Sequence, residues 1–195
     1  MNDTNEINET NPRRDASAAS VSPLPSHAAR PDARSAGEQT NKPAASSTKS
    51  PRRRAREFVL QGLYQWRMSG NDEAAIEAHL HDVSGFDKAD RAFFVGLLRG
   101  VLAQREALQE QLQTSLDRPF GELSPVEACV LLAGAFELVN YPQTPYRVII
   151  NESIELTKGY GGTDGHKYVN GVLDKLAAKL RPVEVEAKRR ARTNP

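Results

Sequence analysis

Four arginines lie close together where the first helical pattern of the chain begins. They are Arg52, Arg53, Arg54 and Arg56, directly after a Ser-Pro pair that is typical of a helix start. Because the amino end of a helix carries a partial positive charge, cations at that end are unfavourable. Binding of a polyanion gives a reason for their presence, since guanidinium groups pair with phosphates. A solvated helix start is the alternative explanation.

Tyr64 belongs to the same predicted helix but lies away from its apolar stripe. At roughly 100° per residue the stripe centres near Val59, Gly62 and Trp66, and Tyr64 falls almost opposite. An exposed tyrosine beside arginines is typical of single-stranded RNA binding, in which the ring stacks on a base. Packing against a neighbouring helix is the alternative for this ring. The residues placed away from the stripe are Arg53, Leu60, Tyr64 and Arg67.

A glycine-rich turn near the carboxyl end is the second candidate site. It spans 158–167, KGYGGTDGHK, and lies between two helical patterns. The turn lacks the GxxxxGK[ST] spacing and follows a helix rather than a strand, which argues against a nucleotide-binding loop. Its glycines are better explained as helix termination. The helix start that follows has free N–H groups beside Lys167 and Tyr168, which predicts a modest anion site with one aromatic ring.

No pattern in the chain indicates catalysis, a metal site or a cofactor. His79 and His81 are two residues apart on a predicted helix and therefore point apart. Cys129 lies in the most apolar helical segment, where an inert core thiol is expected. Glu127 follows Ser124 by three residues, as in a helix capping box. We therefore expect a protein that is not an enzyme.

The elements that must position these residues are all predicted to be helical. The periodicity and the cap residues predict an all-α fold of six main helices in two packed three-helix bundles. The segment 125–141 is apolar on most sides and should be central. The predicted helices span about 51–69, 73–83, 88–116, 125–141, 145–158 and 164–181.

The two ends of the chain differ from the part between them. Residues 1–50 contain five prolines and eight serines with few large apolar residues, so a disordered N-terminal tail is expected. Residues 183–195 are expected to form a disordered basic C-terminal tail. The part from 51 to 181 holds 16 basic and 17 acidic residues, so any nucleic-acid site must be local. No run is long enough to span a membrane, and the single cysteine indicates a cytoplasmic protein.

Three blocks of sequence together resemble the NusB family of bacterial transcription antitermination factors. They are RRRAREFVLQGLYQW, PVEACVLLAGAFEL and INESIELTKGYGGTDGHKYVNGVLDKLA, within a NusB-like helical domain over 51–182. The resemblance implies binding of the boxA element of nascent ribosomal RNA, jointly with the small-subunit ribosomal protein NusE. It implies indirect association with other Nus factors and RNA polymerase. It leaves a homodimer open, because some members self-associate through the surface that would otherwise meet RNA.

The resemblance also implies which residues face RNA. Ala128 and Leu132 depart from the family pattern, because these positions are basic in some members, so this surface should carry less charge. The implied RNA-binding residues are Arg52, Arg53, Arg54, Arg56, Tyr64, Glu127, Asp164, His166, Lys167 and Tyr168.

Two other functions are compatible with a helical domain of this kind. The same domain resembles the N-terminal part of a ribosomal RNA cytosine methyltransferase. That function needs a downstream Rossmann-like domain, and the chain ends at Pro195 without one. A pure protein-interaction bundle is the second alternative, but it gives no reason for an exposed Tyr64 beside four arginines.

Overall fold

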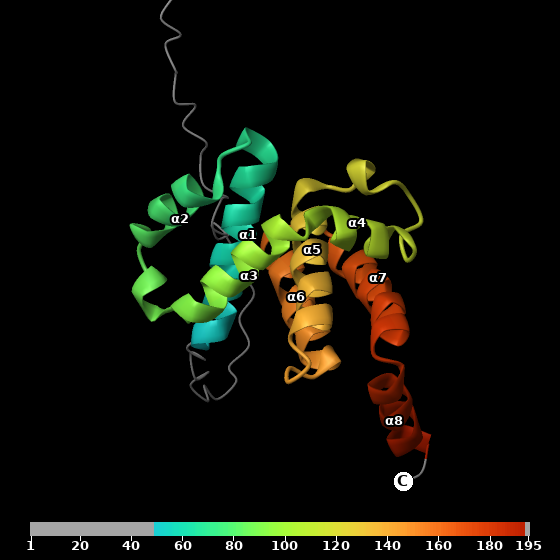
Figure 1. Ribbon diagram of the computed structural model, residues 1–195. Coiled ribbons are helices and arrows are strands. Elements are labelled where there is room, and N and C mark those ends of the chain that lie inside the picture. Colours follow the sequence, from blue (N-terminus) through green and yellow to red (C-terminus); the bar gives the residue numbers. More distant parts are fainter. Residues whose placement is uncertain (1–48, 194–195) are drawn as a thin grey trace, which may run out of the picture.

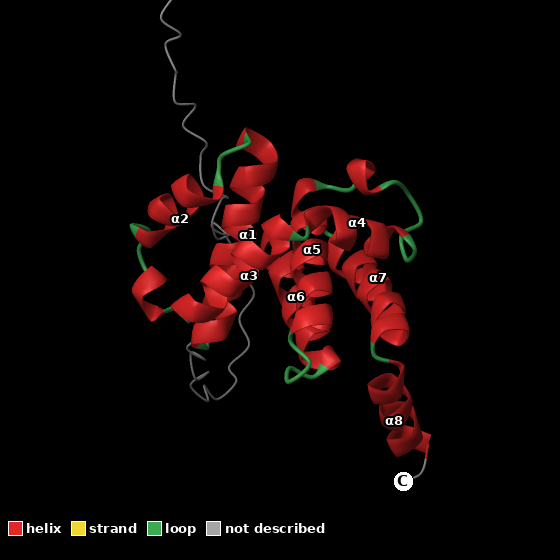
Figure 2. Cartoon of the chain, viewed as in Figure 1, coloured by secondary structure: helices red, strands yellow, loops and turns green. Residues whose placement is uncertain are grey.

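The computed structural model describes residues 49–193, and every regular element in that range is helical (Figures 1 and 2). This confirms the all-α prediction. The tail predicted for 1–50 lies outside the described residues, except for Lys49 and Ser50. Two short 3-10 helices are η1 (Phe86–Lys88) and η2 (Phe120–Glu122). The α-helices are α1 (Pro51–Ser69), α2 (Glu73–His81), α3 (Arg91–Ala103), α4 (Arg105–Gln113), α5 (Pro125–Asn140), α6 (Tyr146–Tyr160), α7 (Gly165–Leu180) and α8 (Pro182–Thr193).

Helix α5 is the centre of the fold. It packs against α1, α3, α4, α6 and α7, and nearly every side chain from Val126 to Leu138 is buried. A helix that is apolar on most sides is stable only when other helices surround it, so the central position of α5 was predictable. The arrangement is consistent with two groups, α1–α3 and α5–α7, that meet along α1 and α5 (Figure 1).

The predicted long helix over 88–116 is wrong, because the chain forms two helices there. Asp90 is the N-cap of α3 and accepts the N–H of Phe93 at 3.0 Å. The helical path then breaks at Gln104, whose φ and ψ are −107° and 14°. Beyond the break α4 turns to lie over α5 and α7 (Figure 1), which buries Leu108 and Leu112 there. The apolar stripe continues through the break because each helix buries its own part of it.

The predicted disorder of 183–195 is wrong for residues 183–193, because Pro182–Thr193 forms α8, and residues 194–195 lie outside the described residues. Pro182 begins this helix rather than only ending α7, since proline is well tolerated at the first helical position. Glu184 connects α8 to the rest of the fold. Its carboxylate accepts the N–H of Tyr146 at 3.0 Å and pairs with Arg181 at 3.3 Å. Among residues 49–193, no helix is long and apolar enough to cross a membrane.

Candidate nucleic-acid interface

The first turn of α1 presents three of the four predicted arginines at the surface. Ser50 caps the helix by accepting the N–H of Arg53 at 3.2 Å, as the Ser-Pro pair predicted. Arg52 is exposed and pairs with Asp90 at 3.5 Å. Arg53 and Arg54 are partly exposed. These guanidinium groups therefore remain accessible to a polyanion.

Arg56 does not fit the predicted RNA contact, because its side chain is inside the protein. Only 6% of it is exposed, and it donates two hydrogen bonds to Glu137, at 2.8 and 2.6 Å. Burial lowers the pKa of Arg56, but the hydrogen bond and charge of Glu137 raise it by more, so the pKa lies above the ordinary value. Arg56 therefore joins α1 to α5 and offers no donor to a ligand.

Tyr64 is neither fully exposed, as stacking on a base would favour, nor fully buried against a neighbouring helix. Its ring is partly buried against the hydrophobic core and partly exposed. Leu60, which the helical wheel placed away from the core, is 2% exposed. The wheel was wrong for Leu60 because α1 is covered on two sides, by α3 and by α5. Tyr64 can still offer part of its ring to a base.

The start of α7 carries an exposed ion pair. Asp164 precedes the helix, and its carboxylate makes no capping hydrogen bond. It pairs instead with Lys167 at 2.8 Å, with both side chains more than 70% exposed at 73% and 72%. The hydrogen bond and charge of Lys167 lower the pKa of Asp164 below its usual value. His166 beside them is partly exposed.

Glu127 reaches this helix start from α5. Ser124 accepts the N–H of Glu127 at 3.3 Å, which confirms Ser124 as the N-cap of α5. The Glu127 carboxylate lies against Gly165, where an added Cβ would stand 2.7 Å from its Oε1 atom. A side chain at position 165 would therefore force the Glu127 carboxylate to move away from the start of α7. The predicted residues Glu127, Asp164, His166, Lys167 and Tyr168 are thus brought to one place.

Asp117 and Arg118 also lie at the start of α7, where both contact Tyr168. The sequence analysis did not identify either residue. The Tyr168 hydroxyl donates to Asp117 at 2.9 Å, and the Arg118 guanidinium lies over the Tyr168 ring at 5.0 Å. Arg118 also donates to Asp117 at 2.9 Å. The hydrogen bonds from Arg118 and Tyr168 lower the pKa of Asp117 to about 2. The only signal in the sequence was an arginine in the loop before Pro119.

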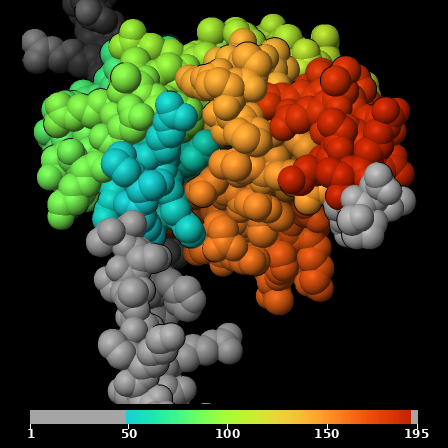
Figure 3. Space-filling view, turned by 90° about the horizontal axis from the view of Figure 1, so that it is seen from below, coloured from blue at the N-terminus to red at the C-terminus, as the bar shows by residue number. Residues whose placement is uncertain are grey.

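The two parts of the candidate interface are joined through α5 and α6. Glu155 on α6 pairs with Arg53 of α1 at 3.4 Å, and Figure 3 shows the cyan start of α1 beside the orange surface of α6. Helix α6 ends at Tyr160, five residues before α7 begins at Gly165. One face therefore runs from the start of α1, across the end of α6, to the start of α7.

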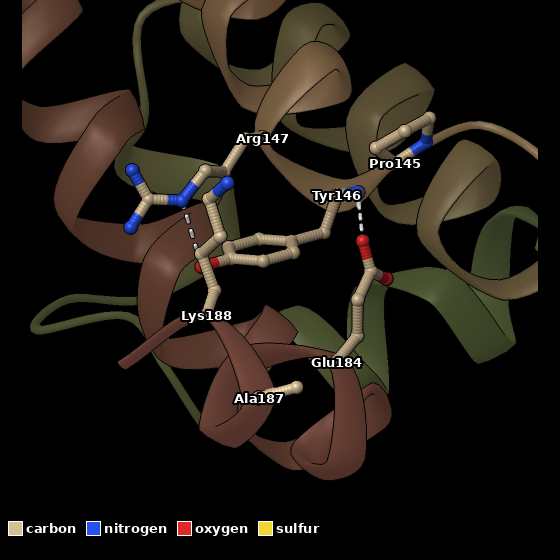
Figure 4. A pocket seen from close by; sticks show the side chains of 6 residues that line it. All are labelled: Pro145, Tyr146, Arg147, Glu184, Ala187 and Lys188. Carbon is tan, nitrogen blue, oxygen red and sulfur yellow. Dashed lines mark hydrogen bonds between the residues drawn. The ribbon is translucent and has the colours of Figure 1, made fainter. Parts of the chain in front are cut away.

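A hollow occurs in a different part of the described structure, beside α8. About 390 Å³ in volume, it separates the start of α6 from α8 (Figure 4). Both carboxylate oxygens of Glu184, which lines it, are already engaged. No group of three or more metal-binding side chains occurs among residues 49–193. Cys129 is buried, and burial raises the pKa of its thiol to about 12. The residues that line the hollow are Pro145, Tyr146, Arg147, Glu184, Ala187 and Lys188.

Comparison with known proteins gives a consistent result. A model of the NusB family matches residues 53–178. The transcription antitermination protein NusB of Dechloromonas aromatica is 69% identical over 144 residues, which cover 74% of this chain and 88% of the relative. That of Ralstonia nicotianae is 57% identical over 153 residues, with 77% and 99% covered.

Solved structures agree on the fold. NusB of T. maritima has a TM-score of 0.62 at 27% identity and covers 71% of this chain and 99% of its own. A structure of NusB and NusE in complex with double-stranded RNA has a TM-score of 0.58 at 20% identity, with 65% and 96% covered. At that identity the likeness concerns the fold alone.

Proposed function

The chain belongs to the NusB family, and on this premise we propose that it is a non-enzymatic transcription antitermination factor that binds RNA through one helical face. We call this surface the RNA face. Its cations supply phosphate contacts, and its two tyrosines supply stacking for bases. The RNA face consists of Arg52, Arg53, Arg54, Tyr64, Arg118, Glu127, Lys158, Asp164, His166, Lys167 and Tyr168.

One observation carries the proposal. Arg53 of α1 and Lys158 of α6 pair with the same carboxylate of Glu155, although the folded part has almost no net charge. Arg118 already lies over the Tyr168 ring, so a guanidinium and an aromatic plane are held together before any ligand binds. A local site of this composition suits single-stranded RNA better than non-specific coating of nucleic acid.

The family implies the partners. We propose that the RNA is the boxA element of ribosomal RNA transcripts and that NusE binds with it, as NusE does with NusB and RNA in a solved relative. Other Nus factors and RNA polymerase would join indirectly, and the cytoplasm would be the place of action. A mobility-shift titration of boxA RNA tests this, and added NusE should tighten binding. Absence of a shift with and without NusE would contradict the proposal.

The two relatives described above do not support the methyltransferase alternative. The two relatives described above are covered over 88% and 99% of their length, which leaves no room in them for a Rossmann-like domain. Both carry the name of an antitermination protein.

Replacing Arg53 with alanine should weaken RNA binding by about three- to tenfold at low salt, because one phosphate contact is lost. The slope of log affinity against log salt should become shallower by about one unit. Fluorescence anisotropy at several salt concentrations measures both quantities. Lys175, an exposed cation on α7 that is not on the RNA face, provides the control. Unchanged affinity and slope in Arg53→Ala would remove Arg53 from the interface.

Replacing Asp164 with asparagine should tighten RNA binding by about two- to fivefold, since a surface charge interaction is worth up to about 1 kcal/mol. The carboxylate is ionised at neutral pH, as an aspartate is at its ordinary pKa, which Lys167 lowers further, and it repels nearby phosphates. The substitution also releases Lys167 from its ion pair. The same anisotropy titration measures the change. Equal or weaker binding would show that Asp164 does not oppose RNA.

A further inference from the structure

We propose that Glu155 acts as a built-in competitor of RNA phosphates and thereby sets the affinity of the RNA face. This inference rests on the proposed function, but it concerns a residue outside the set that the sequence indicated. Glu155 lies on the exposed side of α6, between the arginine-rich start of α1 and the end of α6. Its carboxylate is 42% exposed, so a phosphate can approach the same cations.

The geometry of Glu155 differs from that of an ordinary surface ion pair. One carboxylate oxygen lies 3.4 Å from Nη2 of Arg53, and the other lies 2.9 Å from Nζ of Lys158. A single anion thus holds two cations that come from two helices. These contacts, first the hydrogen bond from Lys158, lower the pKa of Glu155, which is ionised at neutral pH even at its ordinary value.

Glu155 is the strongest case of a pattern that extends over the RNA face. Most of its cations are paired with carboxylates, and each of the other pairs joins one cation to one anion. This explains how a surface rich in arginine and lysine occurs in a folded part with almost no net charge. The other pairs at or beside the face are Arg52 with Asp90, Arg118 with Asp117, and Lys167 with Asp164.

The pairing affects RNA of any sequence. A phosphate that binds Arg53 or Lys158 must displace the Glu155 carboxylate, which then remains nearby and repels it. The affinity of every RNA therefore falls by a similar factor. RNA that is held only through its phosphates then binds too weakly to form a stable complex. RNA that also stacks on Tyr64 and Tyr168 remains bound. Glu155 thus sets a threshold that base contacts must exceed.

The test compares Glu155→Gln with the wild-type chain. Fluorescence anisotropy is measured at low salt with labelled boxA RNA and with labelled polyuridine of the same length. We expect both RNAs to bind the variant about three- to tenfold more tightly, since two surface ion pairs are released. The gain should shrink at high salt, where charges are screened. Thermal unfolding should change little, because exposed pairs contribute little to stability.

Two further variants make the test specific. Glu186→Gln removes a carboxylate that pairs with Arg190 on α8, away from the RNA face, and should leave RNA binding unchanged. In an Arg53→Ala, Lys158→Ala background, Glu155→Gln should tighten binding much less than in the wild type, because the cations it competes for are absent.

The outcomes separate this inference from the proposed function. If the wild type binds boxA RNA and Glu155→Gln binds equally, the inference is overturned. If the variant binds more weakly, the inference is also overturned, and Glu155 is instead a positioning residue for Arg53. If the variant tightens binding equally in the double-alanine background, competition for those two cations is also overturned. If the wild type binds neither RNA, the proposed function itself fails.

Discussion

Replacing Arg56 with alanine is expected to lower the free energy of unfolding by about 3–5 kcal/mol, the usual cost of leaving a buried charge without its partner. The substitution leaves the Glu137 carboxylate, 2% exposed, without the two hydrogen bonds that satisfy it. Urea unfolding followed by circular dichroism measures the change. Replacing Arg53, three residues away and paired at the surface, should cost less than about 1 kcal/mol.

A double substitution shows whether the missing partner is the cause. Replacing Arg56 with methionine and Glu137 with leucine removes both charges and keeps apolar volume between α1 and α5. This variant should regain most of the lost stability, since buried ion pairs are often replaceable by packed apolar residues. If Arg56→Ala unfolds within about 1 kcal/mol of the wild type, the pair does not hold α1 to α5.

Replacing Arg181 with alanine is expected to cost about 2–4 kcal/mol, because a charged donor that serves several backbone carbonyls is lost. The side chain is 9% exposed. It should also release α8, since Glu184 loses one of its two partners. Urea unfolding measures the first effect, and hydrogen–deuterium exchange of α8 measures the second. The carbonyls that Arg181 serves are those of Glu137, Leu138, Tyr141 and Thr144.

Lys175 gives the matched control for Arg181. It is an exposed cation on α7, and its replacement by alanine should leave stability and α8 protection unchanged. Retained protection of α8 in Arg181→Ala would show that α8 does not depend on this anchor.

Local signals in the sequence were sufficient for most of the helices. Ser50 and Ser124 cap α1 and α5 as their Ser-Pro pairs indicated. Gly70, with a φ of 67°, closes α1 in the left-handed conformation that favours glycine. The apolar character of α5 correctly placed it in the centre. These features depend only on neighbours along the chain, so a single sequence shows them.

Features that depend on distant partners could not be predicted in this way. Arg56 looked like its exposed neighbours because Glu137 is 81 residues further along the chain. Leu60 was misplaced because a helical wheel assumes one buried side, and α1 has two. The stacking of Arg118 on Tyr168 joins a loop to α7 and leaves no periodic signal.

The prediction of a disordered C-terminal tail was wrong for a related reason. Its sequence is charged and has little apolar surface, which is typical of a solvated tail. What fixes it is the first turn, where Glu184 accepts the N–H of Tyr146, 38 residues earlier. Glu184 thus satisfies the first amide of α6, and a contact with so distant a residue leaves no signal in the local sequence pattern.

The most direct test of the account is hydrogen–deuterium exchange of the protein with and without boxA RNA. The first turn of a helix opens more readily than its middle, so its amides exchange faster, and bound phosphates should slow that exchange. We predict simultaneous protection at the first turns of α1 and α7, with none at the first turn of α2. Protection at only one of the two helix starts, or only at α8, would contradict a single RNA face.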